Sequence, residues 1–382
     1  MKPVYVAQPF PYTFEKSLYL ASPAWCGSEA PSWRTRALER LAASGYDGVV
    51  YIPESPDGRW RRESNQQMEW ELDAMRRSDV ILFWMPAAKH SMPGDVAPVE
   101  IGFELFHGKV ILGLSKDAKE AHYLEKLAKE CHIVSHPTLE DTVETALRKL
   151  GTGAQRSGAE CLVPLELWCA PHFQQWYTAQ LSAGHLLEDV KNIEWVFRVG
   201  PDRAFPLLIA MHVAIKVCGE NRIKSNEVVI IRPSIVIVCA YCPGDSKEQD
   251  RFILVKEYRT SVMNEAGFVF ELPGGSSFQP GVDQIDIAID ELEQETGVRL
   301  ARERFRIFEK RQIAATMVAN EALLLAVQLD PSEMDEIVAQ QGEMHGKSAE
   351  TEQTYLHVCT RQQIMQEKLV DYATLGQISL VG

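Results

Sequence analysis

The chain has 382 residues, of which 46% are hydrophobic and 24% are charged, and its formal net charge is -14. This length predicts two or three globular domains, and the composition is ordinary for such domains. The acidic balance disfavours a nucleic acid polymer or an anionic membrane as partner. We expect a cytoplasmic protein, because the chain lacks both an apolar run of the ~18 residues that span a bilayer and a signal-peptide core at its start.

Residues 1–150 alternate between short apolar runs and segments with helical periodicity. Strands are expected at 17–23, 49–52, 80–85 and 110–114, and helices at 31–44, 65–77, 98–107, 119–130 and 138–150. In the helix at 65–77, Met68, Leu72 and Met75 should share one face. The pattern predicts an α/β domain with a doubly wound parallel sheet. Its ligand site should then lie in the loops that follow the strands.

The middle of the chain carries no catalytic motif. Residues 151–160 are rich in Gly and Ser, which predicts a linker over 151–162. Residues 163–225 are mostly helical in pattern and are expected to form a helical extension that serves packing or an oligomer surface. The aromatic side chains behind this expectation are Trp168, Trp176, Trp195 and Phe197.

Residues 226–382 are predicted to form a second domain with a mixed sheet and one central helix. Strands are expected at 228–238, 251–258, 268–272, 304–311, 322–329 and 354–359. Cys239 and Cys242 form a C-x-x-C motif within a strand-like run, where residues three apart point to opposite faces. We therefore expect buried thiols here rather than a metal or redox site.

The stretch 272–298 combines a glycine turn, a loop, a carboxylate-bearing helix and a glycine stop. Glu291 and Glu295 are four residues apart, so a helix places them on one face, where they could hold magnesium. Gly274 and Gly275 permit a tight turn next to a phosphate. The alternative is a solvated helix face with no ligand.

This stretch, with Val255-Lys-Glu-Tyr-Arg259 upstream, resembles the Nudix hydrolases of the ADP-ribose pyrophosphatase type. The resemblance implies an α/β/α sandwich with a mixed sheet that hydrolyses a nucleoside diphosphate derivative such as ADP-ribose with magnesium. It also implies a role for each motif residue. Glu291 and Glu295 would bind the metal, and Arg259, Glu271, Gly274 and Gly275 would bind the substrate.

The motif departs from the family pattern at several positions. The loop after Gly275 is one residue longer, Val282 stands where the first Glu is expected, Asp290 replaces an orienting Arg, and Gln294 replaces another Glu. An extra carboxylate could come from Glu321, Glu343 or Glu352. The domain is either an active hydrolase or a catalytically weakened module that senses a nucleotide or is purely structural.

The first domain carries several motifs in a characteristic order. They are Lys16-Ser-Leu-Tyr-Leu-Ala-Ser-Pro23, Ser32-Trp33-Arg34, residues 45–54, Trp70-Glu71, residues 78–84 and Val99-Glu-Ile-Gly-Phe103. Together they resemble the nucleoside 2-deoxyribosyltransferase-like family. The resemblance implies a flavodoxin-like sheet and cleavage of the N-glycosidic bond of a nucleoside or nucleotide, by transfer to another base or to water.

The resemblance also implies catalytic roles for three residues. Glu100 would be the nucleophile beneath the sugar, Asp79 would assist proton transfer to the leaving base, and Tyr19 would orient the nucleophile. The alternatives are a helix N-terminal carboxylate for Glu100, a loop residue for Asp79 and a core side chain for Tyr19. An Asp expected six residues before Glu100 is absent, since Gly94 stands there and Asp95 follows.

Three hypotheses follow for the whole chain. It is a bifunctional nucleotide-processing enzyme, or a glycosidase or transferase regulated by a nucleotide-sensing Nudix domain, or a scaffold in which both domains are degenerate. The expected partner is a nucleoside or nucleotide, and the resemblance implies a homo-oligomer, because family members often complete the site with a neighbouring subunit.

Overall fold

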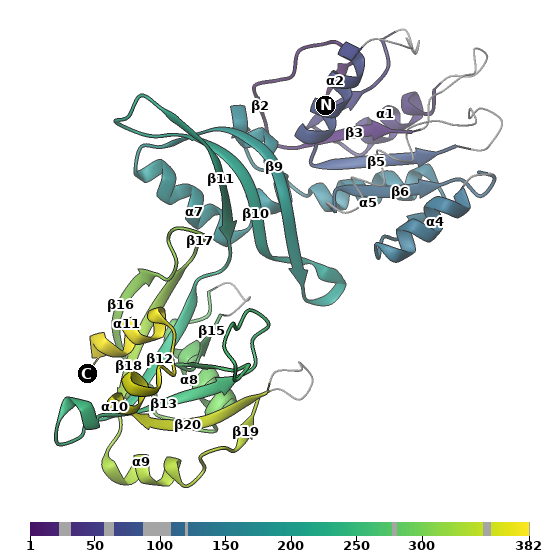
Figure 1. Ribbon diagram of the computed structural model, residues 1–382. Coiled ribbons are helices and arrows are strands. Elements are labelled where there is room, and N and C mark those ends of the chain that lie inside the picture. The colour runs from purple at the N-terminus through teal and green to yellow at the C-terminus, as the bar shows by residue number, and fades with distance from the viewer. Residues whose placement is uncertain are drawn as a thin grey trace. The chain divides into compact units, whose positions relative to one another are not determined.

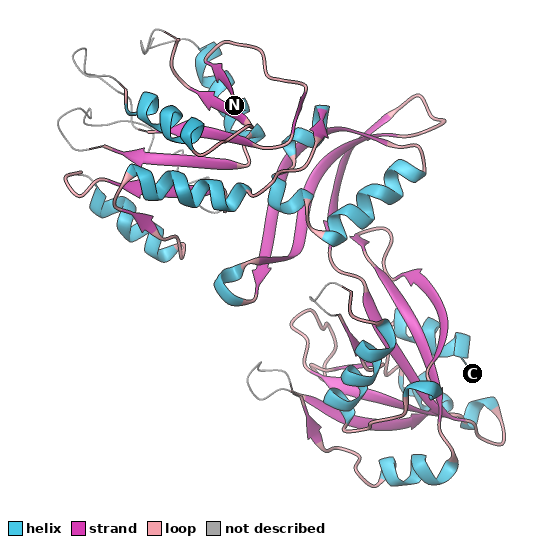
Figure 2. Ribbon diagram, turned by 180° about the vertical axis from the view of Figure 1, so that it is seen from behind, coloured by secondary structure: helices cyan, strands magenta, loops and turns pink. Residues whose placement is uncertain are grey.

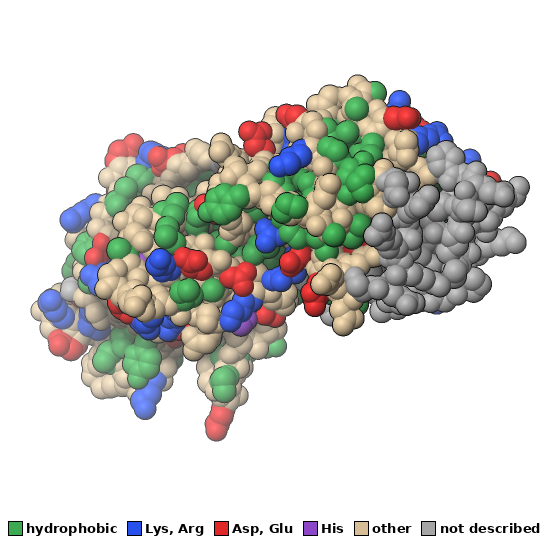
Figure 3. All heavy atoms as spheres, turned by 90° about the horizontal axis from the view of Figure 1, so that it is seen from above, with side chains coloured by type: hydrophobic (Ala, Val, Ile, Leu, Met, Phe, Trp, Pro, Cys, Tyr) green, Lys and Arg blue, Asp and Glu red, His purple; other side chains and the backbone are tan. Residues whose placement is uncertain are grey.

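A computed structural model describes residues 1–22, 32–56, 65–86, 108–118, 121–276, 281–346 and 353–381. The chain divides into two compact units, Met1–Ile230 and Ile231–Gly382 (Figure 1). Among the described residues, the helices are all too short or too polar to cross a membrane. Lys and Arg side chains lie among Asp and Glu on the face seen in Figure 3.

The first unit contains a sheet of six strands in the order β1-β4-β3-β5-β6-β7. Every neighbouring pair runs parallel. From β4 to β7 the strands follow the chain order 2-1-3-4-5 of flavodoxin-like doubly wound sheets. The predicted parallel sheet is confirmed. The strands are β1 (Lys2–Tyr5), β3 (Ser17–Ala21), β4 (Val49–Ile52), β5 (Val80–Met85), β6 (Val110–Leu114) and β7 (Ser135–His136).

Helices cover both faces of this sheet, as Figure 2 shows. Along β3, Leu18 and Leu20 pack with α1 and α5, whereas Tyr19 and Ala21 pack on the face of α2 and α4. This alternation is the ordinary consequence of strand geometry. The helices are α1 (Trp33–Ala43), α2 (Asn65–Arg77), α4 (Ala121–Glu130) and α5 (Leu139–Leu150).

The buried face of α2 differs from the predicted one. Met68 and Leu72 are 54% and 46% exposed, and the helix instead buries Trp70, Ala74 and Met75. The predicted residues and the buried residues both have helical spacing, and periodicity alone favoured the face of Met68 and Leu72. The large indole of Trp70, which donates to the carbonyl of Gln8 at 2.9 Å, determines which face turns inward.

Residues 151–162 belong to the first unit and do not form the predicted linker. The strand β8 (Arg156–Ser157) pairs antiparallel with β2 (Thr13–Phe14), and the 3-10 helix η2 (Gly158–Leu162) follows it. Arg156 is fully buried and forms an ion pair with Asp79. Composition could not reveal this contact, because its partner lies far away in the sequence.

The predicted helical extension over 163–225 is correct only in its first part. Two helices, α6 (Leu165–Trp168) and α7 (Pro171–Ser182), are followed by long strands, β9 (Leu186–Val199), β10 (Phe205–Lys216) and β11 (Ile223–Ile231). β9 and β10 pair antiparallel along most of their length. Trp195 and Phe197 stack with their ring centres 5.5 Å apart, on one face of β9. Their spacing of two residues is the strand period, which was the missed signal.

The second unit contains an eight-stranded mixed sheet in the order β16-β18-β12-β13-β20-β19, with β14 beside β13 and β15 beside β12. β12 runs parallel to β18 and antiparallel to β13. The strands are β12 (Ile235–Cys242), β13 (Arg251–Glu257), β14 (Val269–Glu271), β15 (Gly274–Gly275), β16 (Arg306–Gln312), β18 (Glu321–Gln328), β19 (Met344–His345) and β20 (Thr354–Thr360). The expected mixed sheet is confirmed.

Helices pack on both faces of this second sheet. The helices α8 (Gln284–Thr296) and α9 (Pro331–Val338) cover one face, and α10 (Arg361–Glu367) and α11 (Tyr372–Val381) cover the other. Cys242 lies in the core between the sheet and the helices α8 and α9, and Cys239 lies in the core on the face of α10 and α11. Both thiols are buried and free, as expected, and burial raises the pKa of Cys239 to about 12.

Candidate functional site

The carboxyl edge of the parallel sheet is where this fold should hold its ligand. Chain order reverses between β3 and β5, and ligands of doubly wound sheets bind outside the carboxyl ends of the strands at such a point. The segments that follow β3, β4 and β5 at this edge, 23–31, 57–64 and 87–107, fall outside the described residues. Glu100 lies in the last of them, so its predicted role stays a prediction, as does the helix expected at 98–107.

A buried ion pair lies at the described rim of this edge. The guanidinium of Arg34, in the first turn of α1, pairs with the carboxylate of Glu54, which follows β4. Arg34 also donates to the carbonyl of Leu20 at 3.0 Å and to the hydroxyl of Ser22 at 3.1 Å. Ser32, the N-cap of α1, donates to Glu54 at 2.8 Å. The cluster therefore joins the segments that follow β3 and β4.

Arg34 and Glu54 lie in two of the sequence motifs of the first domain, but neither was predicted as a site residue. Arg34 is 1% exposed and Glu54 is 5% exposed. A signal was present, because Arg34 shares the apolar spacing of Ala37 and Leu41 in the helix. A charged residue on such a face requires a buried partner of opposite charge.

Tyr19 lies in the middle of β3, 3% exposed, in the core on the α2 face. It stands opposite Tyr51 of β4, whose hydroxyl is buried without a hydrogen-bond partner among the described residues. Burial raises the pKa of Tyr51. Phe10 stacks on Trp70 at 5.4 Å and meets Tyr51 edge-on at 5.6 Å between ring centres. The surroundings of Tyr19 are those of a core side chain. The proposed role of Tyr19 in orienting the nucleophile stays a prediction.

Asp79 lies at the opposite, amino edge of the sheet, directly before β5. Both carboxylate oxygens accept hydrogen bonds from the guanidinium of Arg156 at 2.7 Å. The backbone N–H groups of Ser17 and Leu165 donate to the same carboxylate at 2.8 Å each. We therefore correct the expected catalytic role of Asp79. The residue holds β3, β5 and the segment after residue 151 together, and it is not at the carboxyl edge.

The second unit brings together two glutamates and two glycines singled out in the sequence. Asp283 caps the start of α8, and Gly297, with a φ of 73°, ends it. Glu295 is 6% exposed and accepts a hydrogen bond from the N–H of Gly274 at 3.0 Å. A Cβ at Gly275 would collide with the carboxylate of Glu291. The glycine turn therefore lies directly against the two carboxylates.

This group fits magnesium only in a restricted way. The described residues include no set of three His, Cys, Asp or Glu side chains arranged to hold a metal ion. Magnesium is commonly held by one or two carboxylates when substrate phosphates supply further oxygens. Glu291 and Glu295 suit such a shared site, although Gly274 already engages one oxygen of Glu295.

Among the described residues, neither Glu321 nor Glu343 completes a set of three ligands with Glu291 and Glu295. Glu321 forms an ion pair with Lys310 at 2.5 Å. Glu343 follows α9 and is exposed, and Glu352 lies outside the described residues.

Arg259 and Glu271 form an ion pair with each other. The guanidinium of Arg259 lies 3.0 Å from the carboxylate of Glu271 and 2.7 Å from that of Glu257. Glu271 stands opposite Val255 on the α8 face of the sheet, the face of Glu291 and Glu295. Two of the predicted substrate-binding residues thus contact each other, and their contact with a substrate stays a prediction.

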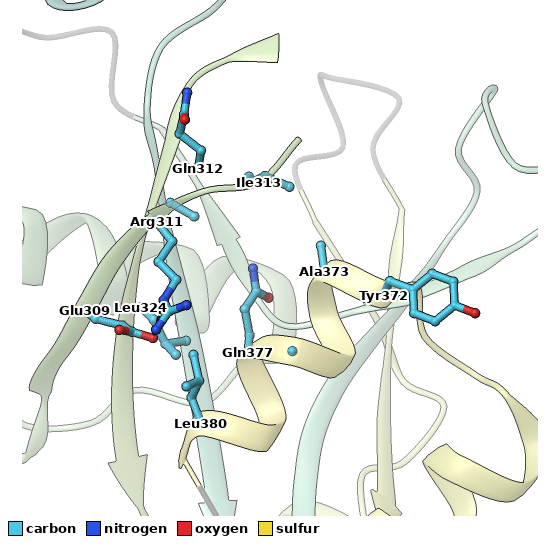
Figure 4. A pocket seen from close by; sticks show the side chains of 11 residues that line it. Glu309, Arg311, Gln312, Ile313, Leu324, Tyr372, Ala373, Gln377 and Leu380 are labelled. Carbon is cyan, nitrogen blue, oxygen red and sulfur yellow. Dashed lines mark ion pairs between the residues drawn. The ribbon is translucent and has the colours of Figure 1, made fainter. Parts of the chain in front are cut away.

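A separate cavity of about 260 Å³ lies between α11 and the β16–β18 pair (Figure 4). Gln377 and Leu380 of α11 face Arg311 and Leu324 across it. Arg311 is already paired with Glu309 at 2.8 Å. The predicted site residues do not line this cavity, so it is distinct from the carboxylate group.

Comparison with known families gives one result. Residues 15–118 match the family described as nucleoside 2-deoxyribosyltransferase like, so this part of the chain is a domain of that kind. The matched segment includes Tyr19, Asp79 and Glu100 and covers less than a third of the 382 residues. A search of curated proteins found no match.

Proposed function

We propose that the first unit cleaves or transfers at the N-glycosidic bond of a nucleoside or nucleotide. The observation that carries the proposal is the family match over 15–118, which includes β3, β4, β5 and β6 of the parallel sheet together with Glu100. The reversal of strand order between β3 and β5 supports the same function, because doubly wound sheets bind their ligands at such a point. Nucleoside chemistry also agrees with a small-molecule partner, whereas a homo-oligomer stays a prediction.

The proposed mechanism uses Glu100 as the nucleophile. Its carboxylate attacks C1′ as the bond to the base breaks, and a second base or water then releases the sugar from the enzyme. Tyr19, on the central strand β3, would orient Glu100. The proton for the leaving base has to come from a group at the carboxyl edge, because Arg156 engages Asp79 at the other edge.

Substitution of Glu100 tests this mechanism. Glu100→Ala should abolish release of free base from a panel of nucleosides and nucleoside monophosphates, measured by chromatography, while the thermal unfolding transition is unchanged. Asp95→Ala, which removes a carboxylate from the same segment, is the matched control and should retain base release. Unchanged release in Glu100→Ala would remove this residue as the nucleophile.

For the second unit we propose a Nudix domain that binds a nucleoside diphosphate derivative such as ADP-ribose. Its support is the pairing of the glycine turn with Glu291 and Glu295 on a helix that covers a mixed sheet. Glu291 and Glu295 would hold a magnesium ion, which would supply positive charge to neutralise a diphosphate. Hydrolysis is the first form of this proposal.

A sensing module is the second form, and a specific observation favours it. The described residues include no set of three side chains arranged to bind a metal ion. In addition, Asp290 and Gln294 stand where the family pattern has an orienting Arg and a further Glu. Losses around a metal site commonly reduce metal affinity or activity by about 10–100-fold. Binding without turnover is the corresponding behaviour.

Titration with ADP-ribose, with and without magnesium, separates the two forms. Magnesium-dependent release of AMP that is lost in Glu295→Gln would support hydrolysis. Asp290→Asn, on the same helix, is the matched control. Tight binding with no product would support the sensor, and neither binding nor turnover by the folded protein would contradict both forms.

A further inference from the structure

A row of aromatic and cationic side chains crosses the sheet of the second unit. The register of β14, β13 and β20 places Phe270, Lys256 and Tyr355 opposite one another. Directly opposite residues of antiparallel strands point to the same face. Lys256 has the same strand parity as Leu254, which packs in the core of α10 and α11. The row therefore lies on the face opposite to Glu291 and Glu295.

Lys256 and Tyr355 of this row line a hollow of about 470 Å³, together with Phe268, Gln341 and His357. The ammonium of Lys256 lies 4.6 Å from the centre of the Phe268 ring. The ring of His357 lies 4.8 Å from that of Phe270. These contacts hold a cation and a ring nitrogen among aromatic faces, at the point where the apolar core of this face ends.

The charge of this hollow contrasts with that of the chain. Its lining residues include a lysine and a histidine but no Asp or Glu, in a chain with a net charge of -14. Among the described residues, Lys256 takes part in no ion pair, and its ammonium lies over the ring of Phe268. Burial, and then the charge of Lys256, lower the pKa of His357, whereas Glu367 on α10 opposes this.

We propose that this hollow binds a nucleoside monophosphate, at a site separate from the carboxylates on the other face. The ammonium of Lys256 would pair with the phosphate, which is a charge-assisted interaction. Aromatic side chains offer stacking surfaces to a base regardless of its identity. Neutral His357 and the amide of Gln341 supply hydrogen-bonding groups at the rim. The proposal goes beyond the function suggested above, because it needs no catalysis by either unit.

Isothermal titration of the full chain with AMP, GMP, CMP and UMP tests the proposal. The matching nucleosides and inorganic phosphate serve as separate probes of the two halves of the ligand. At least one monophosphate should bind more tightly than its nucleoside and than phosphate. Lys256→Met keeps the apolar stem and removes the charge, so it should weaken that binding about 10-fold or more.

Matched variants localise the ligand. Lys310→Met removes one positive charge from the same unit and should bind normally, as should the double variant Glu291→Gln with Glu295→Gln. Tyr355→Leu should weaken binding of the monophosphate but not that of inorganic phosphate. Thermal unfolding of each variant establishes that it is folded.

Three results would overturn the proposal. They are equal affinity in Lys256→Met, loss of binding in the Glu291 and Glu295 double variant, and no binding of any monophosphate to the folded wild type. Titration of Glu100→Ala separates this proposal from the glycosidic one, because base release can fail there while the monophosphate still binds.

Discussion

Two buried Arg–carboxylate pairs lie at opposite edges of the parallel sheet. Arg156 and Asp79 lie at the amino edge, and Arg34 and Glu54 at the carboxyl edge. The two pairs are chemically similar, so it is their positions along the strands that indicate different roles. A pair at the amino edge stabilises the fold, whereas the pair at the carboxyl edge lies where a doubly wound sheet is expected to bind its ligand.

Removal of the Asp79 carboxylate tests its structural assignment. Asp79→Ala leaves Arg156 buried without its partner, and breaking such a pair typically costs about 3–5 kcal/mol. We expect a loss of this size in the free energy of unfolding, measured with urea. Asp47→Ala is the control, since Asp47 pairs with Lys16 at 2.8 Å on the surface and should change stability little. A stable Asp79→Ala protein that has lost base release would restore the catalytic role.

The glycine turn and α8 act as one element of the second unit. Gly274 and Gly275 form β15 against β12, and their neighbours differ in kind. A Cβ at Gly274 would meet the backbone of Val236, whereas one at Gly275 would meet the carboxylate of Glu291. Backbone cannot move without loss of strand pairing, but the end of a glutamate side chain can.

Alanine at each glycine should therefore have a different effect. Gly274→Ala should destabilise the protein by about 1–3 kcal/mol, as overpacking generally does. Gly275→Ala should leave stability nearly unchanged and displace Glu291, so that binding of ADP-ribose with magnesium weakens. Chemical unfolding and titration, performed on both variants, provide the comparison. Equal losses of stability in Gly274→Ala and Gly275→Ala would mean that the side chain of Glu291 cannot move aside.

At the scale of the whole molecule, the first unit is longer than the family match. The match ends at residue 118, whereas the compact unit extends to Ile230. Arg156 and Leu165 both contact Asp79, and buried Cys161 packs in the core on the α2 face. Residues beyond 150 are thus part of the same folding unit as the parallel sheet.

Fragments of the chain test this boundary. A fragment of residues 1–150 should fail to unfold cooperatively, because it leaves Asp79 buried without Arg156 and exposes apolar core. A fragment of residues 1–230 should unfold in one transition, followed by circular dichroism. Cooperative unfolding of the shorter fragment would restore 151–162 as a linker.

Local patterns in the sequence were sufficient for several features of this protein. Uninterrupted apolar runs predicted β4, β5 and β6 in the parallel sheet, because strands buried on both faces need apolar side chains on both. The four-residue spacing predicted that Glu291 and Glu295 would share a helix face, and Gly274 and Gly275 predicted the turn before that helix. Each of these depends on neighbours within a few residues.

Only the tertiary structure decided the features that depend on distant partners. Asp79 meets Arg156, 77 residues away, and that contact changed both its role and the domain boundary. The strands β9 and β10 are stabilised by pairing with each other, so the helical pattern of their local sequence did not decide their conformation. The buried ion pair of Arg34 and Glu54 likewise forms only because the fold brings these two residues together at one edge of the sheet.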